Sequence, residues 1–342
     1  MEIDFQVAAP DFATKHPELH HYTNFNGLRG IIESNTLWAT HFAYLNDSSE
    51  VTLLQKPMVD TLSARALSKV KELLAGESST LVSLVQLELD RGGGASVVVP
   101  EMTKDFVGAL YGAAFNATSI EPMAEPYITS FCAHALDQTY EIANGLLSQW
   151  RAYGGQEQYC IVFDTAELIK LLLREFDSQY YVYTRLDEVH YARDDARIET
   201  IFPDLVSSSE GDLIKAMSGA PIEIAAQTLV ALFSAAPRFK HQGFKEELEV
   251  RVVAIPGKQK FLERVRAEHP GQEERAVKSY RSKAGANGDR PYIALFDELG
   301  EKLPIKRIIV GPSRNQKEYL NRARQVPGEA RKIDCSMTPF IG

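Results

Sequence analysis

The sequence predicts an α+β domain whose split, mostly antiparallel sheet carries helices on its faces and a helical insertion. Short apolar segments of strand length recur from residue 19 onward, and most of them alternate with single helical segments. Residues 51–120 break this alternation because they are mostly helical in pattern. We therefore expect a lead-in segment at residues 1–18 and a single domain at residues 19–342, with the insertion at about residues 51–120.

The composition is that of a folded globular protein, not of a fibrous or disordered one. Of the 342 residues, 44% are hydrophobic and 24% are charged. The 46 acidic and 37 basic residues give a net charge of -9, which argues against broad, nonspecific nucleic-acid binding. This net charge is still compatible with one local basic cleft that binds a specific nucleic-acid substrate.

The cysteines and the lengths of the apolar segments indicate the cellular location of the protein. Cys132, Cys160 and Cys335 are widely spaced and form no CxxC pair or Cys/His cluster, so we expect a reduced chain without a structural metal site. The first residues show neither a basic n-region nor an apolar h-region, and no apolar run approaches the roughly 18 residues of a membrane span. We therefore expect a cytoplasmic protein that has no membrane partner.

A strand, a helix and a second strand open the predicted domain. Residues 19–24 are typical of a strand, residues 25–34 of a helix that packs behind it, and residues 37–40 of the next strand. Because side chains alternate along a strand, His21 and Thr23 share one face and can reach one ligand. Residues of these types also satisfy neighbouring backbone groups, and the residues alone favour that structural interpretation.

The other predicted elements continue the pattern to the end of the chain, and residues 138–144 between them are expected to form a mobile loop. Helices are expected at residues 51–75, 81–89, 103–115, 146–153, 165–176, 213–236 (broken near Pro221), 261–268 and 316–325. Strands are expected at residues 127–132, 159–163, 182–183, 187–191, 247–255, 290–296, 305–310 and 333–337.

An aromatic and basic cluster occupies the short helix expected at residues 146–153. Trp150, Arg151 and Tyr153 lie within four residues of one another, so at least one of them faces solvent or a ligand. An aromatic ring that stacks on a planar base, beside an arginine that pairs with phosphate, suits a dinucleotide. The alternative makes Trp150 a core anchor and Arg151 a surface charge, and the sequence favours neither for Trp150.

Two carboxylates and a guanidinium share one face of the strand expected at residues 247–255. Glu247, Glu249 and Arg251 alternate with apolar residues. Burying such groups without partners is costly. They therefore either line a polar cleft or form a row of structural ion pairs in which Arg251 pairs with one glutamate.

Four blocks of the sequence resemble a known family. They are residues 19–50, which begin Leu-His-His-Tyr-Thr, residues 147–164, residues 239–251, and residues 305–312. In this order they resemble the bacterial domain of unknown function 2971 family, over about residues 17–335. The family's opening is itself similar to that of ADP-ribosyltransferases, in which a first-strand histidine grips the ribose of NAD. The resemblance implies an ADP-ribosyltransferase-like sheet and NAD as the substrate.

The resemblance also implies roles for the residues that would bind NAD. His21 and Thr23 would hold the ribose, Tyr22 between them would also bind NAD, and Trp150 or Tyr153 would pack on the nicotinamide. The sequence departs from better-known ADP-ribosyltransferases here, because its middle motif is not the usual aromatic-Ser-Thr strand.

The charged residues receive roles on the same basis. Glu249 corresponds in order to the catalytic glutamate of ADP-ribosyltransferases and would stabilise the cationic transition state. Glu247 would orient or deprotonate the acceptor, and Arg151 would pair with the pyrophosphate. An NAD glycohydrolase, which transfers ADP-ribose to water, would use the same residues.

The acceptor is either a protein or a nucleic acid, and the resemblance implies a bacterial toxin or phage-defence effector. The candidate contacts for a nucleic acid are Arg29, Lys240, His241, Lys245 and Arg251. The alternative function is a non-catalytic module that binds a nucleotide or a partner on the same fold. A hydrolase or nuclease is less favoured, because the sequence contains no HExxH, GxSxG, GxxxxGK[ST] or paired metal motif.

Overall fold

The chain forms two compact units in the computed structural model. The first, called here the sheet unit, comprises residues 1–46, 124–189 and 243–342, and the second, the helical unit, comprises residues 47–123 and 190–242. Residues 190–242, which the sequence placed in the same domain as the strands, thus belong with the helices. The structure describes residues 7–45, 50–75, 94–115, 125–153, 157–192, 197–218, 221, 224–259, 262–263, 275–284, 288–328 and 331–339.

The sheet unit is built on one ten-stranded open sheet that branches at β3. From β3 (Tyr127–Cys132) one arm runs through β1, β4 and β11 to β12, a second through β2 and β10 to β9, and a third through β8 to β5. Every pairing is antiparallel except that of β11 with β12, so the predicted mixed α+β, mostly antiparallel architecture is confirmed. The other strands are β1 (Glu18–Asn24), β2 (Leu37–His41), β4 (Gln158–Asp164), β5 (Tyr181–Glu188), β8 (Glu249–Pro256), β9 (Tyr280–Lys283), β10 (Arg290–Leu295), β11 (Ile305–Val310) and β12 (Lys332–Cys335).

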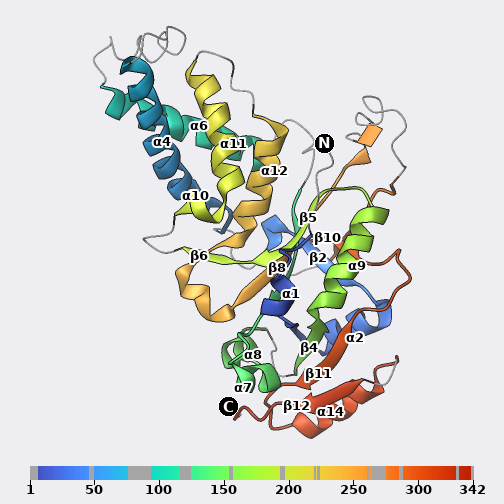
Figure 1. The fold of residues 1–342 in the computed structure, drawn as a ribbon. Helices are drawn as coiled ribbons and strands as arrows, with labels where there is room; N and C mark the ends of the chain where they lie inside the picture. Colours follow the sequence, from blue (N-terminus) through green and yellow to red (C-terminus); the bar gives the residue numbers. More distant parts are fainter. Residues whose placement is uncertain are drawn as a thin grey trace. The chain divides into compact units, whose positions relative to one another are not determined.

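Three helices cover one face of this sheet. α2 (Phe25–Ser34) packs on β1 and β4, α9 (Thr165–Ser178) on β4 and β5, and α14 (Gln316–Gln325) on β11 and β12; Figure 1 shows α9 and α14 beside these strands. Their apolar stripes and the strand residues beneath them form the main core. The side chain of Asn24 caps α2 by accepting a hydrogen bond from the Gly27 N–H. This capped helix behind β1 is the one predicted from the sequence.

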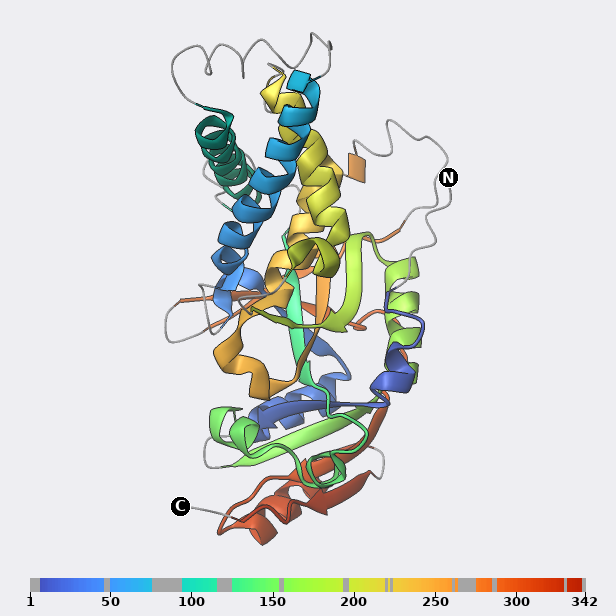
Figure 2. The same ribbon diagram turned by 60° about the vertical axis from the view of Figure 1, so that its left-hand side comes forward.

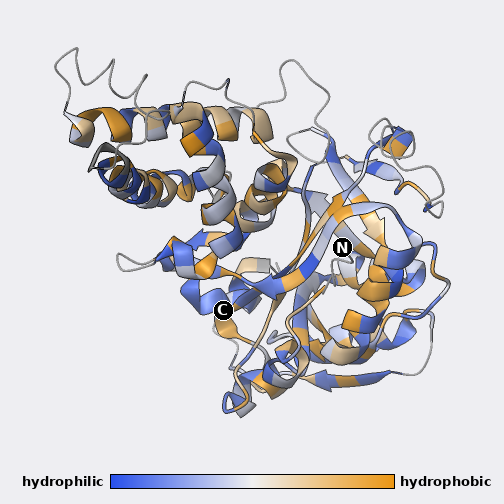
Figure 3. Ribbon diagram, turned by 45° about the horizontal axis from the view of Figure 1, so that its top comes forward, coloured by the Kyte–Doolittle hydropathy of each residue, from blue (hydrophilic) through white to orange (hydrophobic). Residues whose placement is uncertain are grey.

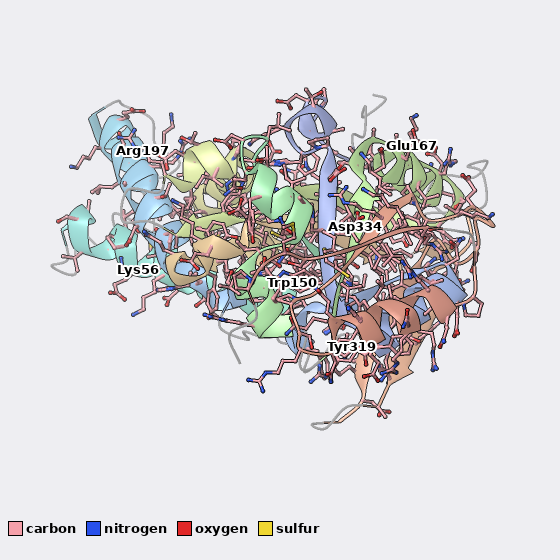
Figure 4. All side chains as sticks on the ribbon, turned by 90° about the horizontal axis from the view of Figure 1, so that it is seen from below. Lys56, Trp150, Glu167, Arg197, Tyr319 and Asp334 are labelled. Carbon is pink, nitrogen blue, oxygen red and sulfur yellow. The ribbon has the colours of Figure 1, made fainter. Side chains whose placement is uncertain are left out.

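The opposite face is covered only in part. Trp150 of α8 (Leu147–Tyr153) is 1% exposed and packs edge-on against Tyr22 of β1. Figure 4 labels it among the packed side chains. Its indole N–H donates to the Asn144 carbonyl at 3.0 Å. Gly145 is required beside it, because its φ is +77° and a Cβ there would lie 2.5 Å from the indole. On this face β2, β10 and β9 have exposed side chains instead.

The sheet forks where β1 and β2 meet β3. One edge of β3 pairs with β8 along its whole length. On the other edge, Cys132 pairs with His20 of β1, and Ile128 pairs with Thr40 of β2. Thr129, Ser130 and Phe131 lie between these pairings and have no ladder partner in β1 or β2. The two strands therefore diverge from one edge and leave a gap over the middle of β3.

The helical unit contains a group of packed helices and one short parallel ribbon. α4 (Gln55–Ala75) packs on α6 (Ala95–Phe115), and α11 (Pro203–Met217) packs on α12 (Ala226–Ala235) and α4, as Figure 2 shows. Blue and orange bands alternate along these helices in Figure 3, as amphipathic helices require. β6 (His190–Ala192) pairs with β7 (Phe239–His241). The smaller helices here are α3 (Glu50–Leu53) and α10 (Ile198–Ile201).

Several predicted elements differ from the structure. Residues 138–144, expected to be a mobile loop, contain the helix α7 (Thr139–Asn144), which ends at Gly145. α6 begins at Ala95, eight residues before the predicted start, and Pro100 lies inside it, where it cannot donate a backbone hydrogen bond. The lead-in contains α1 (Phe12–Lys15), held by the buried Phe12. The helix expected at residues 81–89 lies outside the described residues.

None of the described helices combines the length and the apolarity that crossing a bilayer requires.

Candidate functional site

A cavity of about 530 Å³ opens within the sheet unit over the fork. It lies mostly on the face opposite the main core, because strand residues such as Trp38, Ser130 and Glu249 alternate with the core residues of their strands. Its volume is typical of small-molecule and cofactor sites. It is lined by His20, His21, Tyr22, Trp38, Thr40, Tyr44, Leu45, Ile128, Thr129, Ser130, Phe131, Cys132, Gln149, Glu247, Glu249, Lys283, Ala284, Arg290 and Tyr292.

Two carboxylates define one part of this cavity. Glu249, the first residue of β8, is 8% exposed, and Arg251 is 3% exposed. The Arg251 guanidinium donates to both carboxylate oxygens of Glu249, at 2.7 and 3.0 Å. This fork-to-fork geometry orients the carboxylate. Glu247 precedes it on the short 3-10 segment Gln242–Glu247 and also lines the cavity.

The backbone between the two carboxylates adopts an uncommon conformation. Leu248 has a φ of +47°, in the left-handed region that leucine rarely occupies. Hydrogen bonds hold it there, since the Ala133 N–H donates to the Leu248 carbonyl and the Val189 N–H to the Glu249 carbonyl, both at 2.9 Å. Such conformations cluster at functional sites. This turn brings Glu247 and Glu249 to one cavity although they do not share a regular strand.

The histidines of β1 are neutral, polar parts of the lining. The Nδ1 of His21 donates to the Ser130 carbonyl at 3.0 Å and so bridges the fork. Burial lowers the pKa of His21, although this hydrogen bond acts in the opposite direction. Burial also lowers the pKa of His20 to about 3, and the neighbouring His134 contributes. With its Nδ1 proton used, neutral His21 keeps Nε2 as a hydrogen-bond acceptor.

The other predicted ligand-binding residues are distributed differently. Tyr22 lines the cavity, and its hydroxyl accepts from the Leu146 N–H at 2.7 Å. Thr23 is outside the lining: it lies against Gly27, where an added Cβ would come 1.9 Å from its Oγ1. Trp150 is the core anchor of α8 and does not line the cavity. Its neighbour Gln149 does.

Two predicted residues near Trp150 are not part of the lining. Arg151 is exposed on α8. The side chain of Tyr153 lies outside the described residues. The structure therefore brings together His21, Tyr22, Glu247 and Glu249, and it does not add Thr23, Trp150 or Arg151 to them.

The second arm of the sheet carries aromatic and basic residues that were not predicted from the sequence. Trp38 of β2 stacks on Tyr292 of β10, with ring centroids 4.4 Å apart and planes at 28°. Lys283 Nζ lies 4.8 Å from the Trp38 ring centroid, and Arg290 also lines the cavity. The signal was present in β2, where the buried Leu37 and Ala39 alternate with Trp38 and Thr40.

This arrangement suits an organic ligand that carries rings and anionic groups. Aromatic surface and cations line the second arm of the sheet, hydrogen-bond acceptors of β1 line the first, and the carboxylates lie at the start of β8 in the third. Among the residues that the structure describes, no three His, Cys, Asp or Glu side chains are grouped so as to hold a metal ion. The side chains that line the described cavity offer hydrogen-bonding groups, aromatic surface and two carboxylates.

Comparison with known proteins identifies a family for part of the chain. No curated protein and no solved structure matches it. Residues 149–252 match the model of DUF2971, a protein of unknown function. This range begins at Gln149 and includes Glu247, Glu249 and Arg251. The similarity to this family that the sequence predicted is thus found over residues 149–252.

Proposed function

We propose that the sheet unit is an NAD-dependent, ADP-ribosyltransferase-like enzyme, and that the cavity over the fork is its active site. The observation that carries this proposal is the convergence of His21, Tyr22, Glu247 and Glu249 on one cavity. These residues come from β1 and from the turn before β8, more than 200 positions apart in the chain. The sheet brings them together at the fork.

The reaction breaks the bond between the ribose C1′ of NAD and the nicotinamide nitrogen. The electron pair of this bond leaves with nicotinamide, which becomes neutral, and positive charge develops on the ribose. A lone pair of the acceptor forms the new bond to C1′, and the proton that the acceptor loses passes to Glu247 or to water. Glu249 faces the developing charge, and a preorganised group of this kind is worth about 10²- to 10³-fold in rate.

The described residues also support an orientation for the substrate. His21 is held by the Ser130 carbonyl and keeps Nε2 as an acceptor for a ribose hydroxyl. Tyr22 also lines the cavity. Trp150 has no part in this proposal, because it is buried against Tyr22. Arg151 is exposed on α8, two residues after the cavity-lining Gln149, and its pairing with the pyrophosphate remains a prediction.

A second candidate function is a non-catalytic module that binds a nucleotide in the same cavity. One observation favours it: Arg251 occupies both carboxylate oxygens of Glu249. A carboxylate in such a pair is a weaker partner for a developing cation. Under this alternative the pair shapes the cavity wall and NAD is bound unchanged.

Two measurements separate these candidates. Calorimetric titration with NAD tests binding, and release of labelled nicotinamide, with and without a cell lysate, tests turnover. The enzyme predicts binding and release, with label from the adenylate half passing to an acceptor or to water. The module predicts binding without release. If the purified protein does neither, the enzyme proposal is wrong and NAD is not the ligand of the module.

A further inference from the structure

One face of the second sheet arm gathers aromatic and basic side chains. The residues are Trp38 on β2, Arg290 and Tyr292 on β10, and Arg281 and Lys283 on β9. We call this set the aromatic–basic face. It belongs entirely to the sheet unit, and it differs from the carboxylate part of the cavity in both charge and exposure.

The strand register places these side chains on the same side of the sheet. In β10, Arg290 is directly opposite Lys283 and Tyr292 is directly opposite Arg281. Tyr292 is also opposite Thr40 of β2, two residues beyond Trp38. Directly opposed residues of an antiparallel pair project from the same face. The aromatic–basic face is therefore a property of the β2–β10–β9 pairing, not of flexible loops.

The rings on this face are accessible. Trp38 is 42% exposed, which is high for a tryptophan. Tyr292 stacks against it at a centroid distance of 4.4 Å and holds its plane. Lys283 is exposed and lies over the indole, 4.8 Å from its centroid, so a rotation of this long side chain uncovers the ring for a ligand. The stacked rings of Trp38 and Tyr292 thus form a platform on which a flat base can stack.

The cations beside the platform are available to anions. Arg281 pairs with Asp297 at 2.6 Å. In the parts of the chain that the structure describes, neither Lys283 nor Arg290 forms an ion pair with a carboxylate. The chain as a whole has a net charge of -9. Two such cations flanking exposed rings are therefore a local exception in an acidic protein, and they favour a polyanion at this face.

We propose that the aromatic–basic face binds single-stranded nucleic acid. Bases that stack on aromatic side chains and phosphates that meet lysine and arginine are the two interactions through which proteins hold single strands. A duplex keeps its bases stacked inside and offers no free ring face to Trp38. Because Trp38, Lys283, Arg290 and Tyr292 also line the cavity, a bound strand would have one base at the cavity mouth.

This inference does not require the proposed enzyme activity. It rests on the register and exposure of β2, β9 and β10, whereas the proposed function rests on the residues around Glu249. If both are correct, the strand bound here is the acceptor of ADP-ribose. Strand binding is measured in the absence of NAD, so its failure leaves the NAD experiments unaffected.

The test is the binding of a fluorescein-labelled, single-stranded oligothymidylate of about 12 nucleotides to the full chain, followed by fluorescence anisotropy. We expect saturable binding that weakens between about 50 and about 200 mM salt. Trp38→Leu should weaken it at least about fivefold, because one stacked base is lost. Lys283→Gln and Arg290→Gln should each reduce the slope of log affinity against log salt by about 0.7.

Matched controls remove the same chemistry elsewhere in the sheet unit. Tyr140→Leu removes another exposed ring, and Lys317→Gln another exposed cation; both should bind like the wild type. All the altered side chains are at least partly exposed, so thermal unfolding should show folded variants. The proposal is overturned if neither oligothymidylate nor oligouridylate binds, if Trp38→Leu binds unchanged, or if a duplex of the same length binds as tightly.

Discussion

Two buried sets of opposite charges in the sheet unit look alike in composition but differ in their surroundings. One is Glu249 with Arg251, which borders the cavity. The other is Glu175 with Lys278 and Asp297, in which Lys278 and Glu175 have fully buried side chains. Glu175 lies on α9, and Lys278 and Asp297 flank the β9–β10 hairpin.

In the interior set, which is Glu175, Lys278 and Asp297, the charged atoms form hydrogen bonds and ion pairs with other protein groups. Glu175 Oε1 accepts from Lys278 Nζ at 2.7 Å and from the Tyr181 hydroxyl at 2.8 Å, and its Oε2 accepts from the Phe296 N–H at 3.2 Å. Asp297 is shared between Lys278 and Arg281. This set ties the hairpin that carries Lys283 and Arg290 to α9. The Glu249 pair instead faces open volume beside Glu247 and Gln149.

The two sets contain similar charged groups, and their roles differ because one is enclosed by protein and the other borders a cavity. A fully partnered, enclosed set contributes to the position of a hairpin. A pair at a cavity wall can meet water or a ligand, and it is the one that we connect with function. The predictions below test this distinction, in order of decreasing effect.

The largest effect is expected when the interior set loses its cation. Lys278→Met leaves Glu175 buried without its main partner, and it should lower the free energy of unfolding by about 3–5 kcal/mol. Urea denaturation measures this value. Lys317→Met, on the exposed side of α14, should stay within about 0.5 kcal/mol of the wild type. A loss below about 1 kcal/mol for Lys278→Met would refute the structural role of the interior set.

Replacing the cation of the cavity pair, which is Glu249 with Arg251, should lower the free energy of unfolding by less. Arg251→Met leaves Glu249 without its guanidinium, but water in the cavity can hydrate the carboxylate, so we expect a loss of about 1–3 kcal/mol. Combining it with Glu249→Met should recover part of this loss, because the carboxylate that lost the Arg251 guanidinium is removed as well. If Arg251→Met is as destabilising as Lys278→Met in urea, the two sets do not differ as we claim.

The smallest loss of stability is expected for a partly exposed ion pair, Glu18 with Arg307. Glu18 accepts from Arg307 at 2.8 and 2.6 Å. Burial alone would raise the pKa of Glu18, but the hydrogen bonds from Arg307 and Lys306 prevail and lower it to about 2. The stabilisation is therefore present above the ordinary carboxyl pKa, near 4.5, and is lost as the pH falls toward 2.

The variant Glu18→Gln isolates this contribution. At pH 7 it should be less stable than the wild type by about 1 kcal/mol, discounted for the solvent that screens the pair. The difference should shrink steadily as the pH is lowered from about 4.5 to about 3. Urea denaturation at a series of pH values measures it, and a difference that stays constant over this range would contradict the assignment.

The local elements were predictable from the sequence to different degrees. The opening strand, helix and strand and the helix α14 were predicted with bounds within one residue of those observed, because strong periodicity and caps such as Asn24 define them. The helix α7 was missed because Thr139–Asn144 is too short and too polar to show a periodic apolar face. It forms in place, where Asn144 bonds to Trp150, Ser336 and Met337.

The candidate site was predictable only where neighbours in sequence are also neighbours in space. Glu247 and Glu249 were selected as a pair because they are two residues apart. Trp38 and Tyr292 are 254 positions apart and meet only through the pairing of β2 with β10. A single sequence contains no signal for that pairing. For the same reason the sequence did not single out Lys283 and Arg290, the cations that line the cavity. The nucleic-acid contacts that it favoured, Arg29, Lys240, His241, Lys245 and Arg251, stay a prediction.

The central claim is that the cavity at the fork turns over NAD and that Glu249 is required for it. The most direct measurement is nicotinamide release by the wild type and by Glu249→Gln, under conditions where thermal unfolding shows both proteins to be folded. Glutamine keeps an oxygen for Arg251 but carries no charge, so the account predicts release by the wild type and a loss of about 10²- to 10³-fold in the variant, with NAD still bound. Equal rates of release from the two folded proteins would contradict it.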